Sequence, residues 1–290
     1  MKTTIVYKKE HNFEIKGDFY PVSEESSPVI VYIHGGGLLY GAREDIKKHQ
    51  VELYHSAGFN VFSIDYRLAP ETKLPFIVED IHSALEWVVN EAPKQYKVDP
   101  QRIAVIGSSA GAYLALMSGT FQKRKPQAIV SFYGYGDIAG EWAVQPNKHY
   151  QAMTKVPRNL VDMLISDNIV TTGPIERRYA LYLYVRQQGK WIKEISGLHP
   201  EINKSELSQF SPLLSMNDHY PPTLLLHGTM DDDVPYEQSL LMYNALQKAN
   251  VVSRLITIPN GKHVFDEDWE NPIVQQAFTE VISFLKTQLG

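Results

Sequence analysis

The feature that most constrains the fold is a series of short apolar segments separated by segments with helical periodicity. Continuous apolar runs are typical of strands that are buried on both faces. The predicted central strands are Pro28–Ile33, Val61–Ile64, Ile103–Ile106, Ala128–Phe132, Thr223–Leu226 and Arg254–Ile258. Thr3–Lys8 and Phe13–Tyr20 are predicted to add a hairpin at the sheet edge. Helical spacing is clearest over Leu74–Asn90 and from about Pro272 onward. This alternation predicts an α/β fold with a mostly parallel, twisted sheet of about eight strands and helices on both faces.

One long region interrupts the alternation. Residues Gly134 to Leu214 lie between two predicted strands and far exceed an ordinary crossover in length. The region contains predicted helices at Arg158–Ile165 and Ile175–Gln187 and the rings of Tyr179, Tyr182, Tyr184 and Trp191. We expect residues 134–214 to form a cap over the functional site, and residues 1–133 and 215–290 to form the core domain. For each single ring, packing of the insertion onto the core is the preferred interpretation, with pocket lining as the alternative.

Composition excludes several classes of function. The apolar content of 43% and charged content of 21% are those of a globular protein with a real core. A net charge of −5 without a long basic run argues against a nucleic-acid surface. With no cysteine, the chain has no disulfide, thiolate zinc site or cysteine nucleophile. The chain begins without the apolar core of a secretory signal, and no apolar run reaches membrane-spanning length. We therefore expect a cytoplasmic protein without stable membrane insertion.

A pentapeptide with a central serine joins one predicted strand to a helix. Gly107-Ser108-Ser109-Ala110-Gly111 follows Ile103–Ile106 and precedes the helix-compatible segment Ala112–Phe121. G-x-S-x-G between a strand and a helix is the setting of a nucleophile on a sharp turn. The flanking glycines permit the tight turn and hold the serine in a strained, exposed position. The pattern is centred on Ser109 and not on Ser108, so Ser109 is the predicted nucleophile.

A glycine-rich loop is the predicted oxyanion site. His34-Gly35-Gly36-Gly37 follows the strand Pro28–Ile33. Glycines are needed there because side chains would keep backbone N–H groups away from a substrate oxygen. We expect donation from Gly36 and Gly37, joined by the N–H of Ala110. Phosphate binding is disfavoured because the loop lacks both the Lys-Ser/Thr pair and the G-x-G-x-x-G spacing. His34 is expected to organise the loop.

The predicted base and acid follow later strands. His263 follows the last strand and is the one histidine of ten that completes the chain order Ser, Asp, His. His227 is expected to be structural. The acid should follow the strand Thr223–Leu226, where three aspartates are consecutive: Asp231, Asp232 and Asp233. Chemistry alone leaves the choice among them open. A metal site is disfavoured because the run lacks the interleaved spacing of a calcium loop.

Together these motifs resemble those of the hormone-sensitive-lipase-like esterases of the α/β-hydrolase superfamily. The matching segments are His34–Gly37, Asp65–Glu71, Pro75 with Glu79-Asp80, Gly107–Gly111, His227–Pro235 and Gly261–Phe265. The resemblance covers the predicted core almost end to end and implies the α/β-hydrolase fold with a cap insertion. It places the acid at Asp231, with Asp232 as the fallback and Asp233 third. It also makes Asp65 and Arg67 structural supports near the oxyanion loop.

The function that the motifs and the resemblance imply is hydrolysis of carboxylic esters through an acyl-enzyme. We expect short-chain acyl esters, although the family's acyl and alcohol preferences are not carried over to this chain. The triad would be Ser109, His263 and Asp231, with neither a cofactor nor a metal. An unperturbed histidine predicts loss of activity as the pH falls through roughly 6–7. Two alternatives stay open: an amide-cleaving relative, such as an arylformamidase or small peptidase, and a non-catalytic ligand-binding homologue. A homodimer also stays open.

Overall fold

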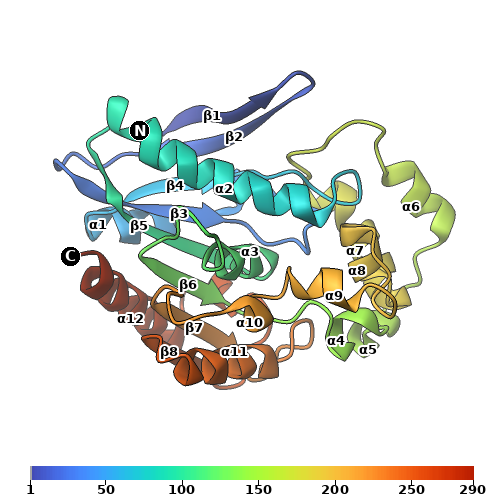
Figure 1. Cartoon of the computed structure of the whole chain (residues 1–290). Helices are drawn as coiled ribbons and strands as arrows, with labels where there is room; N and C mark the ends of the chain where they lie inside the picture. The colour runs from blue at the N-terminus through green and yellow to red at the C-terminus, as the bar shows by residue number, and fades with distance from the viewer. Residues whose placement is uncertain (1) are drawn as a thin grey trace.

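The strands of the computed structural model form one eight-stranded sheet across the described residues, 2–290 (Figure 1). The sheet order is β1-β2-β4-β3-β5-β6-β7-β8. β2 pairs antiparallel with β1 and β4, whereas all pairs from β4 to β8 are parallel. The α/β prediction is therefore confirmed. The strands are β1 (Thr3–Glu10), β2 (Phe13–Tyr20), β3 (Ser27–Ile33), β4 (Asn60–Ile64), β5 (Val98–Ser108), β6 (Ala128–Phe132), β7 (Thr223–Gly228) and β8 (Ser253–Ile258).

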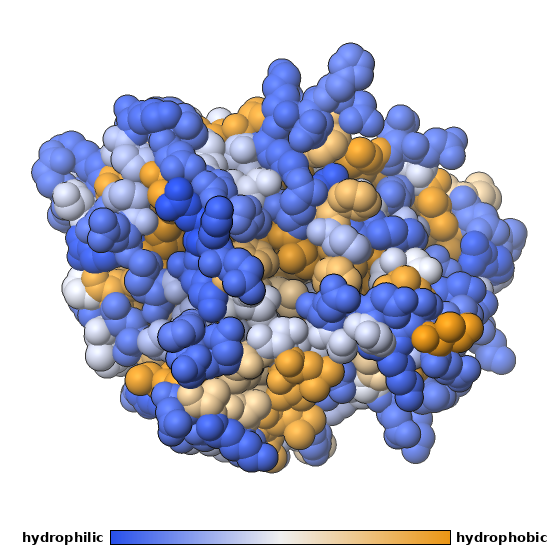
Figure 2. Space-filling model, viewed as in Figure 1, coloured by the Kyte–Doolittle hydropathy of each residue, from blue (hydrophilic) through white to orange (hydrophobic). Residues whose placement is uncertain are grey.

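Helices cover both faces of this sheet and create two hydrophobic cores. Alternate residues of β3 enter opposite cores: Val29, Val31 and Ile33 enter one, Ile30 and Tyr32 the other. The first core is covered by α2 (Leu74–Asn90), α3 (Ala110–Ser118) and α11 (Glu237–Lys248), the second by α1 (Lys48–Ser56) and α12 (Pro272–Leu289). Burial on both faces explains the continuous apolar runs. Outside the cores, the face in Figure 2 is mainly hydrophilic, with apolar residues in small groups.

The insertion between β6 and β7 consists of one longer helix and several short ones at one end of the sheet (Figure 1). Its two predicted helices are present as α6 (Arg158–Leu164) and α7 (Ile175–Gln188). Five more were not predicted, because helices of four to six residues are too short to show an apolar repeat. They are α4 (Glu141–Val144), α5 (Lys148–Gln151), α8 (Trp191–Ser196), α9 (Lys204–Ser208) and α10 (Pro212–Ser215). Across the described residues, every helix is too short or too polar to span a bilayer.

Helix α7 is fixed to the core by a buried arginine. Both Nη atoms of Arg178 bind the carboxylate of Glu71, at 2.9 and 2.7 Å. The same guanidinium donates to the backbone carbonyls of Leu39 and Ala69. A bidentate Arg–carboxylate pair has a defined geometry, so this contact sets where α7 lies relative to the loops after β3 and β4.

Two glycines allow α3 to lie directly against the ends of the central strands. A Cβ on Gly111 would overlap the carbonyl oxygens of Ile33 and His34. A Cβ on Gly107 would overlap the backbone of Gly111. Backbone cannot yield as a flexible side chain can, so only glycine fits at either position.

We therefore expect Gly111→Ala to lower the free energy of unfolding by roughly 3 kcal/mol or more, the upper part of the range for overpacking. Gly58→Ala is the matched control, since Gly58 has φ +91° but no heavy atom within 4 Å of a built Cβ. It should lose only about 1–2 kcal/mol, from backbone strain. Urea unfolding of both variants measures the difference. Equal losses would show that the close approach at Gly111 is unimportant.

Candidate active site

The turn between β5 and α3 presents Ser109. Its φ of 54° and ψ of −119° lie outside the ordinary regions for a residue with a side chain. Its backbone N–H donates to the carbonyl of Phe132 at 2.9 Å, which ties the turn to the end of β6. The serine also lies at the N-terminus of α3, where the helix dipole favours negative charge. The strained turn predicted for Ser109 is therefore present.

Ser109, His263 and Asp231 form a continuous chain of hydrogen bonds. His263 Nε2 lies 3.0 Å from Ser109 Oγ, and His263 Nδ1 lies 2.8 Å from Asp231 Oδ2. Asp231 follows β7 and His263 follows β8, so the three side chains come from loops at neighbouring strand ends. A nucleophile bonded to a base, which is itself oriented by a third group, is the arrangement needed to activate a hydroxyl.

The Asp231 carboxylate is buried and held by several donors. Its Oδ1 accepts hydrogen bonds from the backbone N–H groups of Asp233 and Val234, at 3.0 and 2.9 Å. Its Oδ2 is also 3.2 Å from Nε2 of His227, a buried side chain whose Nδ1 contacts Ser239 Oγ. Burial by itself would raise the pKa of Asp231, but the hydrogen bonds from His227 and His263 hold it below the usual range. The carboxylate therefore stays ionised near neutral pH. The contact between His227 and Asp231 was not predicted.

The other two aspartates lie elsewhere. Asp232 is exposed, and its Oδ2 is 2.9 Å from Nδ1 of His149. Asp233 is buried, and its Oδ2 is 3.6 Å from Nε2 of His263, the nitrogen that faces Ser109. Of the three candidates, Asp231 is thus the one hydrogen-bonded to His263 Nδ1.

Gly36 and Gly37 line the pocket beside Ser109. Their φ values are 102° and 59°, and an added Cβ would overlap the Tyr40 carbonyl oxygen at Gly36 and the Tyr182 ring at Gly37. Trp191 Nε1 donates to the Gly37 carbonyl at 2.9 Å, so the insertion braces this loop. Ala110, the third expected donor, is the first residue of α3.

Of the residues expected to be structural, His34 contacts the glycine loop directly, whereas Asp65 and Arg67 form ion pairs elsewhere. His34 stacks on Tyr66 with ring centroids 4.3 Å apart, and the Tyr66 hydroxyl donates to the His34 carbonyl. Asp65 accepts hydrogen bonds from the backbone N–H and the guanidinium of Arg43, at 2.8 and 2.5 Å. Arg67 instead pairs with the buried carboxylate of Asp80.

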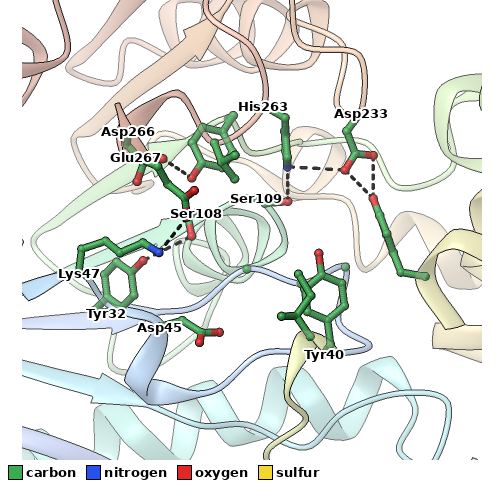
Figure 3. A pocket seen from close by; sticks show the side chains of 17 residues that line it. Tyr32, Tyr40, Asp45, Lys47, Ser108, Ser109, Asp233, His263, Asp266 and Glu267 are labelled. Atoms are coloured by element: carbon green, nitrogen blue, oxygen red, sulfur yellow. Dashed lines mark hydrogen bonds and ion pairs between the residues drawn. The ribbon is translucent and has the colours of Figure 1, made fainter. Parts of the chain in front are cut away.

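The pocket around Ser109 has a volume of about 250 Å³ and two unlike sides (Figure 3). One side is aromatic and contains Tyr40 and Tyr182, whose ring centroids are 5.9 Å apart. The other is polar and contains Tyr32, Lys47, Ser108, Tyr133, Asp266 and Glu267. Of the four rings singled out in the insertion, Tyr182 lines the pocket. The polar residues were missed because they lie far apart in the sequence and share no motif. Within residues 2–290, no group of three or more His, Asp or Glu side chains could hold a metal ion.

Comparison with solved structures supports the fold described above. A solved α/β-hydrolase superfamily protein from Enterococcus faecalis is 25% identical, and the match covers 99% of both chains with a TM-score of 0.81. An esterase from Thermogutta terrifontis, solved with butyrate bound, is 24% identical and covers 99% of this chain and 94% of its own, with a TM-score of 0.70. At that identity the second likeness concerns the fold alone.

One curated relative is a far longer protein. A non-reducing polyketide synthase of Aspergillus terreus is 28% identical over 316 residues. The match covers 91% of this chain but only 13% of the synthase.

The parallel sheet, the strained turn at Ser109 and the loops after β7 and β8 define an α/β-hydrolase. The chain belongs to the BD-FAE family, whose model matches residues 18–246. The resemblance to α/β-hydrolase esterases is therefore confirmed.

The charges around His263 predict the pH below which activity is lost. Burial would lower the pKa of His263, but the hydrogen bond to Asp231 and the negative charges of Asp233, Asp231 and Asp266 raise it above the ordinary value of 6.5. The imidazole must be neutral to accept a proton, so activity is lost as the pH falls through this raised pKa. We expect the acid limb of a kcat/KM profile to lie above pH 6.5. A limb well below 6.5 would contradict this electrostatic account.

The geometry also predicts that replacing Asp231 lowers kcat/KM far more than replacing the neighbouring Asp232. Asp231→Asn should lower kcat/KM by about 10⁴-fold, because an amide does not enforce the same imidazole tautomer. Asp232→Asn is the matched control and should change kcat/KM less than about threefold, because exposed charges have weak effects. Steady-state kinetics of both variants provide the comparison. A larger loss in the Asp232 variant would move the acid assignment to Asp232.

Proposed function

We propose that this protein hydrolyses small carboxylic esters through an acyl-enzyme formed on Ser109. The observation that carries the proposal is the hydrogen-bonded chain from Ser109 Oγ through His263 to Asp231. His263 accepts the serine proton as Oγ attacks the carbonyl carbon, then gives that proton to the leaving alcohol. A water molecule repeats the sequence and releases the acid. Asp231 orients the imidazole and stabilises its positive charge.

Backbone donors beside Ser109 would stabilise the negative oxygen of the tetrahedral intermediate. We assign this role to the N–H groups of Gly36, Gly37 and Ala110. Positive φ at both glycines and the position of Ala110 at a helix N-terminus support the assignment. The Trp191 hydrogen bond to Gly37 keeps the loop in place before substrate arrives, which is the condition for effective preorganisation.

The size of the pocket supports short acyl chains. A volume of about 250 Å³ lies below the range of roughly 300–1,000 Å³ typical of sites for drug-sized ligands. We infer that residues 134–214 act as the cap that limits this volume, because α7 places Tyr182 against Gly37. Butyrate in the Thermogutta esterase is a ligand of that protein, and its size is compatible with the same proposal.

Replacement of each adjacent serine tests the proposal. Ser109→Ala should lower kcat/KM for 4-nitrophenyl butyrate by roughly 10⁴-fold or more and abolish labelling by a fluorophosphonate. Ser108→Ala is the matched control and should still be labelled, because Ser108 Oγ contacts the Tyr32 hydroxyl and not His263. Normal turnover by the Ser109 variant would refute the proposal. Absence of both turnover and labelling in the folded wild-type protein would favour the ligand-binding alternative.

A further inference from the structure

We propose that Asp233 accepts a hydrogen bond from the N–H of a scissile secondary amide, so that this site cleaves amides as well as esters. The inference rests on the proposed function, because it uses the same nucleophile and base. It assigns a substrate-specificity role to a residue that the triad does not use.

The carboxylate of Asp233 lies beside the atom that delivers the proton to the leaving group. Asp233 Oδ2 is 3.6 Å from His263 Nε2 and lines the same pocket as Ser109. In Figure 3, dashed lines join the same nitrogen of His263 to Ser109 and to Asp233. A leaving atom that takes a proton from Nε2 must come within about 3 Å of it. Such an atom can be within hydrogen-bond reach of Asp233 Oδ2 at the same time.

Surrounding groups hold the Asp233 carboxylate in this position. The Tyr182 hydroxyl is 2.7 and 2.8 Å from the two carboxylate oxygens, and Arg186 Nη2 is 3.3 Å from Oδ1. The Arg186 guanidinium is itself buried among the rings of Trp142, Tyr150, Tyr182 and Trp191. The Tyr150 side chain also hydrogen-bonds to this carboxylate. A carboxylate has about four acceptor sites, and Tyr182, Tyr150 and Arg186 use about three, which leaves one for a hydrogen bond from the pocket.

Asp233 makes structural contacts through both its backbone and its carboxylate. The Asp233 N–H donates to Asp231 Oδ1, and its carbonyl accepts from Arg186 Nη2 at 2.8 Å. Neither bond needs the carboxylate. The carboxylate faces the buried Arg186 guanidinium through Oδ1, at 3.3 Å, and His263 Nε2 through Oδ2, at 3.6 Å. Pairing with Arg186 accounts for the buried charge. A hydrogen-bond acceptor beside His263 is what the second oxygen adds.

A secondary amide carries a hydrogen on its leaving nitrogen that Asp233 could bind, whereas the leaving oxygen of an ester carries none. When Ser109 adds to an amide, the nitrogen becomes pyramidal, and its lone pair must turn toward His263 Nε2 to receive the proton. The original N–H then needs an acceptor, which Asp233 supplies. The C–N bond breaks, the amine leaves with its own hydrogen and the serine proton, and water releases the acid. An ester oxygen carries no hydrogen, so Asp233 offers it no such bond.

The test compares three butyryl substrates: a 4-nitrophenyl ester, a 4-nitroanilide and the N-methyl-4-nitroanilide. Values of kcat/KM are used because they report acylation for all three, and the pH is kept on the plateau of each profile. Wild-type protein should cleave the anilide and prefer it to the N-methyl analogue. In Asp233→Ala, which removes the acceptor, the anilide-to-ester ratio should fall at least about tenfold and the preference for N–H should disappear. Asp232→Ala is the matched control and should keep the wild-type ratio.

Several outcomes would overturn the inference. Wild-type protein that cleaves the ester but not the anilide contradicts it while leaving the proposed function intact. An equal loss of both activities in Asp233→Ala would assign the carboxylate a role in stability or in the basicity of His263. If that variant does not fold, the anilide-to-ester ratio is measured in Asp233→Glu, which keeps the charge but moves the oxygen by one methylene. Wild-type protein that cleaves neither substrate contradicts the proposed function itself.

Discussion

The close contact between α3 and the end of β3 is the constraint on which the rest of the site depends. Gly111 lies against the carbonyl oxygens of Ile33 and His34, where no side chain would fit. This contact brings the N-terminus of α3, and with it Ser109, next to the loop that begins at His34. Ser109 and the expected oxyanion donors are therefore adjacent because the two backbones are in direct contact. The loops after β7 and β8 then bring Asp231 and His263 to Ser109.

The insertion is attached to the loops around Ser109 by three buried side chains. Arg178 fixes α7 to the core, Trp191 holds the Gly37 carbonyl, and Arg186 holds the backbone of the acid-bearing loop. A displacement of α7 would disturb both the glycine loop and the residue that donates to Asp231. This coupling explains why the insertion belongs to the catalytic architecture that we propose.

Sequence reasoning was accurate where a long periodic pattern or a local motif existed. Both ends of α2 (Leu74–Asn90) were predicted, because its buried residues repeat over several turns. Helix α1 (Lys48–Ser56) was missed because Val51 and Tyr54 are its only buried apolar residues. The sequence alone does not distinguish the three consecutive aspartates. In the structure, Asp231 contacts Nδ1 of His263, whereas Asp233 lies near Nε2 on the opposite side of the ring. The polar pocket wall could not be predicted from the sequence, because it brings together Tyr32, Tyr133 and Asp266 from distant parts of the chain.

The central claim is that Ser109 carries an acyl group during turnover. The most direct test mixes the protein with 4-nitrophenyl butyrate, quenches the reaction with acid within milliseconds and locates any added mass by peptide mass spectrometry. We predict a butyryl group on the peptide that contains Ser109, at that serine, accompanied by a burst of about one equivalent of nitrophenol. Turnover without any covalent adduct, or an adduct on Ser108, would contradict the account.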